Sequence, residues 1–414
     1  MTNGIKTAQP PQRKRLAVFL DGTWNTVGDN TNVWRLKALC AERSADGLRQ
    51  VAYYSKGVGT SSGEKVRGGM FGYGLDRAIT DAYEWLVEVY EPDDEIFIFG
   101  FSRGAYTARS LAGFIAKCGL LRRGSPLGVK QLFDRYRKDD TVSTIHTLLQ
   151  MPPSIIAKLG IEERWMISDA RPVSIKMVGV WDTVGALGIP FGNIPGISRS
   201  GFKFLHTGLR IPIENAYHAV AIDEHREAFA PTLWTKKFHD HIPASKIAAP
   251  RPIESVEQRW FVGAHANVGG GCRSDLLAQR PLQWLMQKAE RLGLTFRGAV
   301  EPSPEMLGAE ISNSFEEFAW GLYAQAKRHK PFYREIGEAP RPFAGGHDET
   351  VNETIDASVF ERWRANAAYR PQNLLDWRTR HDVDPANLTT AVLAHDPHTV
   401  VPEITAMPPH TLSA

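Results

Sequence analysis

The sequence predicts an α/β protein built around a mainly parallel sheet with helices on both faces. Short apolar runs rich in Val, Ile and Phe alternate with amphipathic stretches, the pattern typical of repeated strand–helix–strand units. The chain has 414 residues, of which 43% are hydrophobic and 23% are charged, as in ordinary globular proteins. A chain of this length can bury a sizeable core.

Each expected element is a segment with one clear periodicity. The expected strands are the short apolar runs Leu16–Leu20, Gln50–Tyr54, Glu95–Phe101, Ser174–Trp181 and Gln258–Val262. The expected helices are Asn32–Glu42, Leu75–Tyr90, Ala105–Lys117, Ser274–Arg291 and Ser358–Ala368. In the second of these helices, apolar residues recur at the three- and four-residue spacing of one helical face: Ile79, Ala82, Trp85, Leu86 and Val89.

Two irregular regions and a change in pattern divide the chain. We expect a core over residues 1–300, with cap insertions near 120–172 and 185–250, and a helical C-terminal flank over 301–414 packed on the core. Prolines interrupt the first insertion, and glycine and proline fill the start of the second. The alternation of strands and helices is lost after about residue 300, which predicts the flank.

Charge, cysteines and hydropathy exclude several classes of protein. A formal charge of +3 is too small to predict nucleic-acid binding. Cys40, Cys118 and Cys272 are far apart, so neither a disulfide framework nor a zinc site is expected. The N-terminus lacks the apolar core of a signal peptide, and no stretch approaches the roughly 18 apolar residues of a membrane span. We expect a cytoplasmic chain, with export by a route that reads no signal peptide left open; nothing in the sequence indicates an oligomeric state.

The stretch EIFIFGFSRGAYTARS, residues 95–110, carries the most specific chemical signal. An apolar strand runs into Gly-x-Ser-x-Gly around Ser102, and a helix with small residues follows. A serine in such a sharp strand-to-helix turn is exposed as a nucleophile, and its small neighbours allow strand and helix to approach closely. The alternative is a plain turn between two glycines. The flanking strand and helix favour the nucleophile.

A nucleophilic serine needs a base and an orienting acid, which follow it in this architecture in the order Ser, acid, His. Asp182 ends the strand-like run SIKMVGVW, and His265 follows a strand and precedes three glycines. Asp223 is the competing acid, but its surroundings favour a helix and a surface ion pair with Arg226. The pair His239 and His241 has no evident carboxylate or cysteine partner, so we expect no metal site there.

The oxyanion of an acyl-transfer intermediate needs two amide donors. We expect one from Arg103, after the serine, and one from the early loop at Gly22 and Thr23. That loop also resembles a phosphatase signature, but Phe19 stands where the nucleophilic aspartate would be. The region Gly57–Gly74 lacks the Gly-Lys-Ser/Thr ending of a phosphate-binding loop.

Six motifs together resemble a known family. They are RLAVFLDGTWN, VGT at 58–60, DEIFIFGFSRGAYTAR, VGVWDTVGALG, WFVGAHANVGGG and ETIDASVFERWRANAAYRPQNL, in order from about Leu16 to about Leu375. The resemblance is to a large α/β-hydrolase family, mostly uncharacterised, whose best understood members are bacterial type VI secretion lipase effectors acting as phospholipases. It implies an α/β-hydrolase fold and a triad of Ser102, Asp182 and His265. Many relatives carry Asp where this chain has Asn267.

These observations predict a serine hydrolase that cleaves carboxylic esters and needs neither a metal nor an organic cofactor. A lipid ester, chiefly a phospholipid, is the first substrate by resemblance, with transient contact to a membrane surface. Two alternatives stay open: a soluble carboxylesterase acting on small or polymeric esters, and a non-catalytic binding protein with a hydrolase fold. The complete triad disfavours the binding protein.

Overall fold

A computed structural model describes most of the chain. The described residues are 13–22, 29–57, 70–138, 143–185, 212–241, 251–272, 274–317 and 327–402, with the single residues Pro243, Ala249, Ala324 and Gln325. Thr23, the VGT motif at 58–60 and most of the glycine- and proline-rich segment after Gly185 lie outside them.

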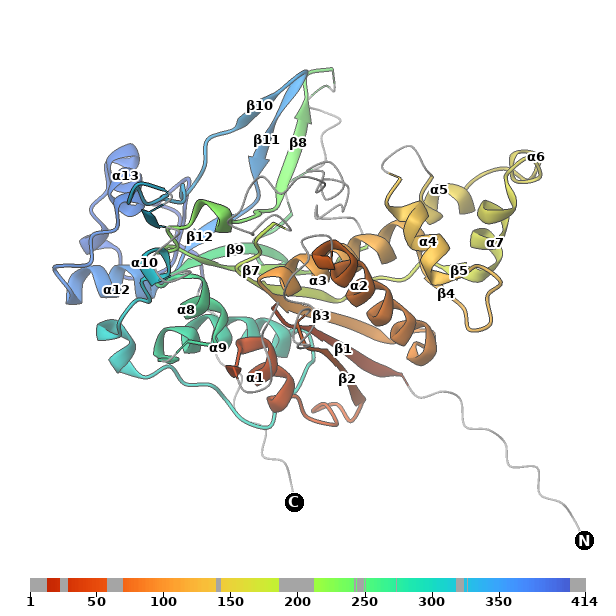
Figure 1. Cartoon of the computed structure of the whole chain (residues 1–414), viewed down its shortest axis with the longest axis horizontal. Coiled ribbons are helices and arrows are strands. Elements are labelled where there is room, and N and C mark those ends of the chain that lie inside the picture. Colours follow the sequence, from red (N-terminus) through yellow and green to blue (C-terminus); the bar gives the residue numbers. More distant parts are fainter. Residues whose placement is uncertain are drawn as a thin grey trace, which may run out of the picture.

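An eight-stranded sheet forms the centre of the described structure (Figure 1). Its strands lie in the order β13-β12-β9-β7-β6-β3-β1-β2, and every neighbouring pair is parallel except β12 and β13. The bounds are β1 (Lys14–Leu20), β2 (Arg49–Ser55), β3 (Glu95–Phe101), β6 (Met177–Trp181), β7 (Ala216–Ala221), β9 (Val256–Phe261), β12 (Glu353–Ile355) and β13 (Val392–Leu393). The predicted mainly parallel α/β architecture is confirmed.

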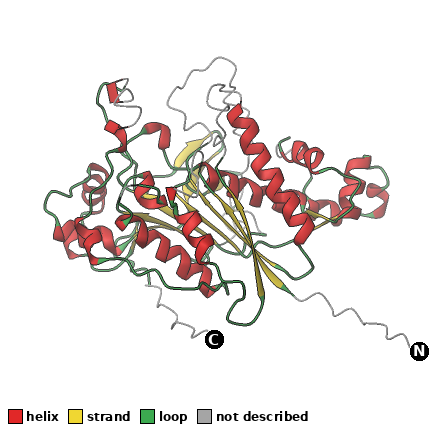
Figure 2. Cartoon of the chain, turned by 60° about the horizontal axis from the view of Figure 1, so that its bottom comes forward, coloured by secondary structure: helices red, strands yellow, loops and turns green. Residues whose placement is uncertain are grey.

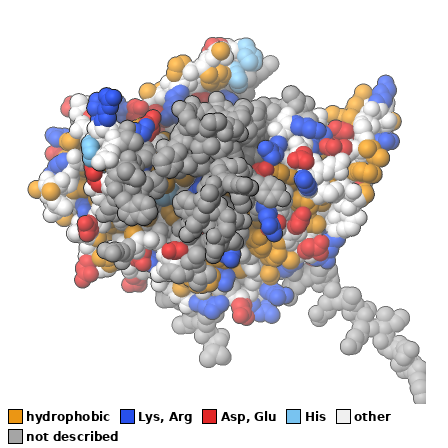
Figure 3. All heavy atoms as spheres, in the orientation of Figure 1, with side chains coloured by type: hydrophobic (Ala, Val, Ile, Leu, Met, Phe, Trp, Pro, Cys, Tyr) orange, Lys and Arg blue, Asp and Glu red, His pale blue; other side chains and the backbone are white. Residues whose placement is uncertain are grey.

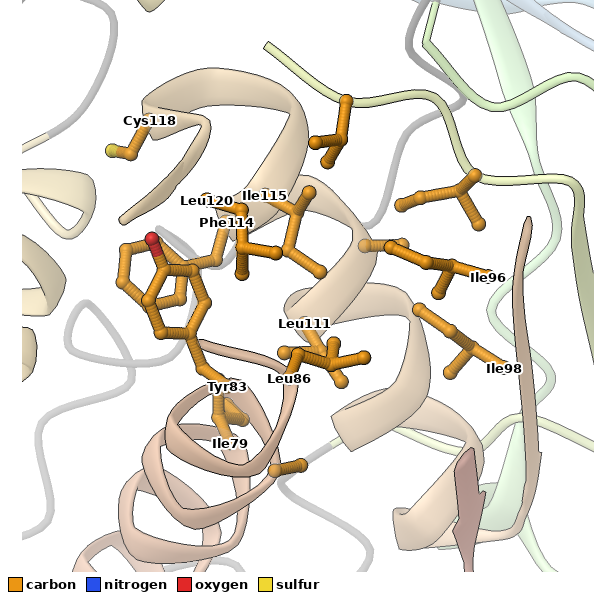
Figure 4. Packing of buried hydrophobic residues seen from close by; sticks show 14 of the residues in the cluster. Ile79, Tyr83, Leu86, Ile96, Ile98, Leu111, Phe114, Ile115, Cys118 and Leu120 are labelled. Carbon is orange, nitrogen blue, oxygen red and sulfur yellow. The ribbon is translucent and has the colours of Figure 1, made fainter. Parts of the chain in front are cut away.

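Helices cover both faces of the sheet, because side chains alternate along the buried strands (Figure 2). Leu16, Val18 and Leu20 pack in one cluster with α2 (Met70–Val89) and α3 (Arg103–Cys118). Ala17 and Phe19 point to the other face, in a cluster with α1 (Asn32–Leu39) and α9 (Leu276–Arg291). Figure 4 shows the first cluster, where Tyr83 of α2 and Phe114 of α3 stack with ring centroids 4.3 Å apart.

The segment near 120–172, expected to be a cap insertion, forms short helices and a two-stranded sheet. It contains β4 (Leu120–Leu121), α4 (Val129–Tyr136), α5 (Ile145–Leu149), α6 (Pro153–Ile156), α7 (Ile161–Asp169) and β5 (Ala170–Arg171). It leaves the end of α3 and returns to the start of β6, so it is attached at the amino ends of the parallel strands (Figure 1). The carboxyl ends of the parallel strands, and the residues that follow them, lie at the opposite edge of the sheet from this segment.

The segment expected to be a helical flank also contributes strands. Besides α12 (Ala357–Ala365) and α13 (Gln372–His381), it supplies β12 and β13 to the main sheet. It also supplies β10 (Arg341–Phe343) and β11 (Gly346–Thr350), which pair with β8 (Thr235–His239) in a small antiparallel sheet that projects from the body in Figure 1. The remaining short helices are η3 (Glu227–Phe229), α8 (His265–Gly269), η5 (Pro304–Gly308), α10 (Ser314–Glu317) and η7 (Pro385–Asn387).

Part of the predicted second insertion, 185–250, belongs to the core. β7 lies inside that range and forms a fully buried central strand between β6 and β9. Within the described residues, no helix combines the length and apolar character needed to cross a membrane. Positive and negative side chains are interspersed over the visible described surface (Figure 3).

Candidate active site

The three residues predicted as a triad meet at the carboxyl edge of the sheet. Ser102 follows β3, Asp182 follows β6 and His265 follows β9. Because these strands are parallel, their ends lie at the same edge, although Ser102 and His265 are 163 residues apart in sequence. The structure thus brings Ser102, Asp182 and His265 together.

Ser102 occupies the strained turn that its flanking glycines predict. Its backbone has φ 58° and ψ −123°, a conformation that residues with a side chain rarely adopt. A Cβ on Gly104 would lie 2.2 Å from the carbonyl oxygen of Leu20, and one on Gly100 would lie 2.4 Å from that of Gly104. Only glycine therefore permits this close approach of β3, β1 and α3, which presents the serine at the start of the helix.

His265 bridges the other two side chains. Its Nε2 lies 2.8 Å from Ser102 Oγ, and its Nδ1 lies 2.5 Å from Asp182 Oδ2. The imidazole packs between two rings, with centroid distances of 4.7 Å to Phe101 and 5.0 Å to Phe229. Burial lowers the pKa of His265, opposed by the hydrogen bond and charge of Asp182. A neutral imidazole in this tautomer can accept the serine proton at Nε2. His265 begins the short helix α8.

Asp182 is held from three sides. It is fully buried and has φ 37°, so its own backbone is also in the left-handed region. Its Oδ1 accepts from the amide of Ala221 at 2.9 Å and from Nη1 of Arg334 at 2.6 Å. Its Oδ2 accepts from His265 and from Nη2 of Arg334 at 3.0 Å. Burial alone would raise the pKa of Asp182, but the charge of Arg334 and the bond to His265 outweigh it and hold the pKa well below its usual range.

Arg334 is a site residue that the sequence analysis missed. It lies in an irregular segment between α10 and β10, with no periodicity or motif to mark it. Its guanidinium is fully buried. The sequence alone does not show whether an arginine is buried or exposed. The burial of Arg334 depends on its partner Asp182, which lies 152 residues away along the chain.

The competing acid, Asp223, belongs to a different local network. It lies two residues after the end of strand β7, so the expected helix is absent. Its Oδ2 accepts from the amide of Gly263 at 2.7 Å and the hydroxyl of Tyr369 at 3.2 Å. Arg226 pairs with Glu224 instead, through two bonds of 2.7 and 2.8 Å. The expected Asp223–Arg226 ion pair is therefore corrected to Glu224–Arg226.

Glu224 supports the histidine from behind. Its Oε2 accepts from the backbone amide of His265 at 3.2 Å and from Ser314 Oγ at 2.9 Å. Burial would raise the pKa of Glu224, but its pairing with Arg226 lowers that pKa to about 2. Arg226 in turn lies over the ring of Phe229, 3.5 Å from the centroid, on the ring that contacts His265. An ionised carboxylate thus fixes the start of α8.

The structure places the three expected oxyanion donors differently with respect to their backbone amides. Arg103 is the first residue of α3, where a helix leaves its backbone amides without partners inside the helix. The amide of Gly22 donates to Asp21 Oδ1 at 2.8 Å, so it is already engaged. Thr23 lies outside the described residues. The oxyanion role of Arg103 and Thr23 stays a prediction.

Asn267 stabilises the loop around His265. Its Oδ1 accepts from the amides of Ala264 at 3.1 Å and Ser312 at 2.9 Å, and its Nδ2 donates to Cys272 Sγ. An aspartate at this position could accept the same two bonds but could not donate to the thiol. The local geometry of the histidine loop therefore does not require a charge at this position.

The pair His239 and His241 lies in the small antiparallel sheet and the turn after it, with ring centroids 5.4 Å apart. His239 contacts the ring of Phe343 edge-on. In the part of the chain that the structure describes, no three His, Cys, Asp or Glu side chains are grouped to hold a metal ion.

Comparison with known proteins decides the family. A family model described as "T6SS, Phospholipase effector Tle1-like, catalytic domain" matches residues 14–288. The chain belongs to this Tle1-like family. The matched range contains Ser102, Asp182 and His265, whereas Arg334 lies beyond its end. The α/β-hydrolase fold expected from the six motifs is that of the described structure.

Individual relatives are distant or partial. The uncharacterized protein YEL023C of Saccharomyces cerevisiae is 29% identical over 256 residues, which cover 56% of this chain and 35% of the yeast protein. A crystal structure of an uncharacterized protein from Pseudomonas aeruginosa aligns with a TM-score of 0.40 and 16% identity, covering 76% of this chain and 51% of that one. A Tle1 effector bound to the VgrG spike of the type 6 secretion system aligns with a TM-score of 0.31 and 16% identity, covering 63% and 52%.

Proposed function

We propose that the chain is a serine hydrolase that cleaves carboxylic esters of phospholipids through an acyl-enzyme. The observation that carries the proposal is His265, which contacts Ser102 with one ring nitrogen and the buried Asp182 with the other. This arrangement of nucleophile, base and orienting acid is the one that acyl transfer requires. We infer phospholipids as the substrate class from the description of the Tle1-like family.

In the proposed mechanism, His265 Nε2 takes the proton of Ser102 as Oγ attacks the ester carbonyl carbon. Asp182 keeps the imidazole in the required tautomer and stabilises the imidazolium that forms. The amide of Arg103, the residue after the nucleophile, binds the oxyanion, and the sequence-based expectation for the second donor is Thr23, which lies outside the described residues. The imidazolium then protonates the departing alcohol, and water repeats the sequence to release the fatty acid.

Fluorophosphonate labelling followed by a lipid panel tests this proposal. The wild-type protein should be labelled at Ser102, whereas Ser102→Ala should fold normally, escape labelling and lose roughly 10³-fold or more of its turnover. Phosphatidylethanolamine and phosphatidylglycerol vesicles would be compared with monomeric acetate and butyrate esters. Release of fatty acid from the vesicles supports the phospholipase.

The same experiment separates the alternatives. Preference for the short monomeric esters would identify a soluble carboxylesterase instead. Absence of labelling in the folded wild-type protein would identify a binding protein and overturn the proposal. Retention of more than about a tenth of the activity by Ser102→Ala would show that Ser102 is not the nucleophile.

A further inference from the structure

We propose that Arg334 is a positioning residue for the triad, which fixes the Asp182 carboxylate and keeps His265 neutral at rest. This inference rests on the proposed function, since it assigns a role within the same site. It concerns a residue outside the range that the family model matches. Four hydrogen bonds, the charge balance around His265 and the anchoring of the Arg334 segment support it.

Within the described residues, the guanidinium of Arg334 makes two hydrogen bonds to Asp182 and two to backbone carbonyls. Nη1 donates to Asp182 Oδ1 at 2.6 Å and to the carbonyl of Ala221 at 2.7 Å. Nη2 donates to Asp182 Oδ2 at 3.0 Å and to the carbonyl of Phe229 at 2.5 Å. A planar guanidinium that binds both carboxylate oxygens fixes the carboxylate plane, which one ammonium group cannot do. Asp182 can then present Oδ2 to His265 in a single orientation.

The two backbone carbonyls bound by Arg334 belong to segments that contact the triad. Ala221 ends β7, and its amide also donates to Asp182 Oδ1. Phe229 contacts the other side of the triad, with its ring against His265. Arg334 therefore ties the acid to the two backbone segments that border the base, so a shift of either segment would move the whole unit.

The charge of Arg334 also acts on the base. The charged groups around His265 are Asp182, Glu224 and Arg226, with Arg334 behind Asp182. His218, which β7 holds beside Asp182, stays neutral because burial lowers its pKa to about 3. A cation bound to the carboxylate offsets part of the attraction between Asp182 and an imidazolium. Arg334 thus favours the neutral imidazole, the form that can act as a base.

The segment that carries Arg334 is held on both sides. Before it, the amide of Phe332 donates to the carbonyl of His225 at 2.9 Å. After it, Arg380 of α13 donates to the carbonyl of Ile336 at 2.6 Å, and the amide of Gly337 donates to Glu353 of β12 at 3.1 Å. Contacts with the C-terminal part of the chain therefore hold the Arg334 segment in place beside the site.

A merely structural ion pair would make different predictions from a positioning residue. Loss of a structural pair lowers the folded fraction but leaves each folded site unchanged. Loss of a positioning residue lowers kcat per active site with little change in KM, and removal of its charge moves the acid limb of the pH–rate profile. Two substitutions distinguish charge from geometry, since Arg334→Lys keeps the charge and Arg334→Gln removes it.

The experiment measures the rate of fluorophosphonate labelling, and kcat and KM for a p-nitrophenyl ester, from pH 5 to 9. Active-site titration with the fluorophosphonate normalises each rate. We expect Arg334→Gln to lower kcat about 10- to 100-fold at unchanged KM, as loss of a residue that orients a functional group does. Its acid limb should move to higher pH, because the imidazolium loses a nearby cation. Arg334→Lys should lower kcat about tenfold and keep the wild-type acid limb.

Arg135→Gln is the matched control. Arg135 is also a buried arginine, bound to Glu163 at 2.7 Å, but it lies in the insertion at the amino edge of the sheet. We expect a lower melting temperature and wild-type rates per active site. If Arg334→Gln does not fold, Arg334→Lys decides the question through its kcat at unchanged KM.

Several outcomes would overturn the role of Arg334. Wild-type kcat per site in Arg334→Lys, or a wild-type kcat and acid limb in a folded Arg334→Gln, would reduce Arg334 to a structural residue while leaving the serine hydrolase intact. A folded wild-type protein that is not labelled at Ser102 would overturn the proposed function, and the role of Arg334 with it.

Discussion

Asp182 and Asp223 both lie shortly after buried central strands, but they have opposite properties. Each follows a neighbouring parallel strand, β6 and β7, and each is buried. Asp182 meets Arg334 and His265, which hold its pKa well below the usual range. Asp223 meets an amide and the Tyr369 hydroxyl, and burial raises its pKa. The position at the end of a strand brings a carboxylate to the site edge, but its partners decide whether it can orient a base.

The largest expected effect comes from exchanging each acid for its amide. Asp182→Asn should lower turnover by roughly 10⁴, because the amide favours the wrong imidazole tautomer. Asp223→Asn should keep turnover within about tenfold, since Asp223 does not contact the triad imidazole. Steady-state rates of the two folded variants test the comparison. A near-active Asp182→Asn beside an inactive Asp223→Asn would reverse the assignment of the acid.

A smaller effect should follow from changing Glu224, the residue after Asp223. Glu224→Gln keeps the size of the side chain but removes the charge beside His265, so turnover should fall about tenfold as the histidine loop loses part of its support. The negative charge of Glu224 raises the pKa of His265, so its removal should move the acid limb to lower pH. This direction is opposite to that expected for Arg334→Gln. A pH–rate profile that moves the same way in both variants would contradict the electrostatic account.

The smallest effect concerns the pH dependence of stability. The lowered pKa of Asp182 stabilises the fold above the ordinary Asp pKa, and this contribution is lost as the pH falls through the lowered value. The raised pKa of Asp223 has the opposite sign: its contribution is present at low pH and is lost as the pH rises through the raised value. Melting temperatures at pH 2, 4 and 7 test both, because the Asp182 contribution changes between pH 2 and pH 4 and the Asp223 contribution changes above pH 4. As the pH rises, the melting temperature of Asp223→Asn should rise relative to that of the wild type. The melting temperature of Asp182→Asn should fall relative to that of the wild type.

The positions of Ser102 and Asp182 were predictable because each directly follows a strongly apolar strand, whereas His265 lies four residues after the end of β9, whose sequence VEQRWF is mixed. Runs such as EIFIFGF mark a buried strand regardless of context, and the residue after such a strand in a parallel sheet lies at the site edge. β7 was missed because its sequence, AYHAVA, is half alanine, which favours helices; burial between β6 and β9 overrides that propensity. That single miss also produced the helical environment wrongly expected for Asp223.

Arg334 shows a second limit of the sequence. Its segment has no periodic pattern, and the value of an arginine there depends on contacts with Asp182, Ala221 and Phe229, which only the folded chain brings near. The engaged amide of Gly22 is a similar case, because a loop position alone does not show whether a donor already has an acceptor. Local sequence predicts elements and their ends, whereas side-chain partnerships across the sheet require coordinates.

The wide spacing of the site residues along the chain has a consequence for folding. The contacts that join His265 to Ser102 and Arg334 to Asp182 span 163 and 152 residues. Closing such long loops is slow, and parallel pairing cannot form from local contacts alone. During synthesis, the serine and the acid emerge from the ribosome well before the histidine and the arginine. A nascent or truncated chain therefore holds Ser102 without His265, and the proposed hydrolysis can begin only once the sheet has closed around both residues.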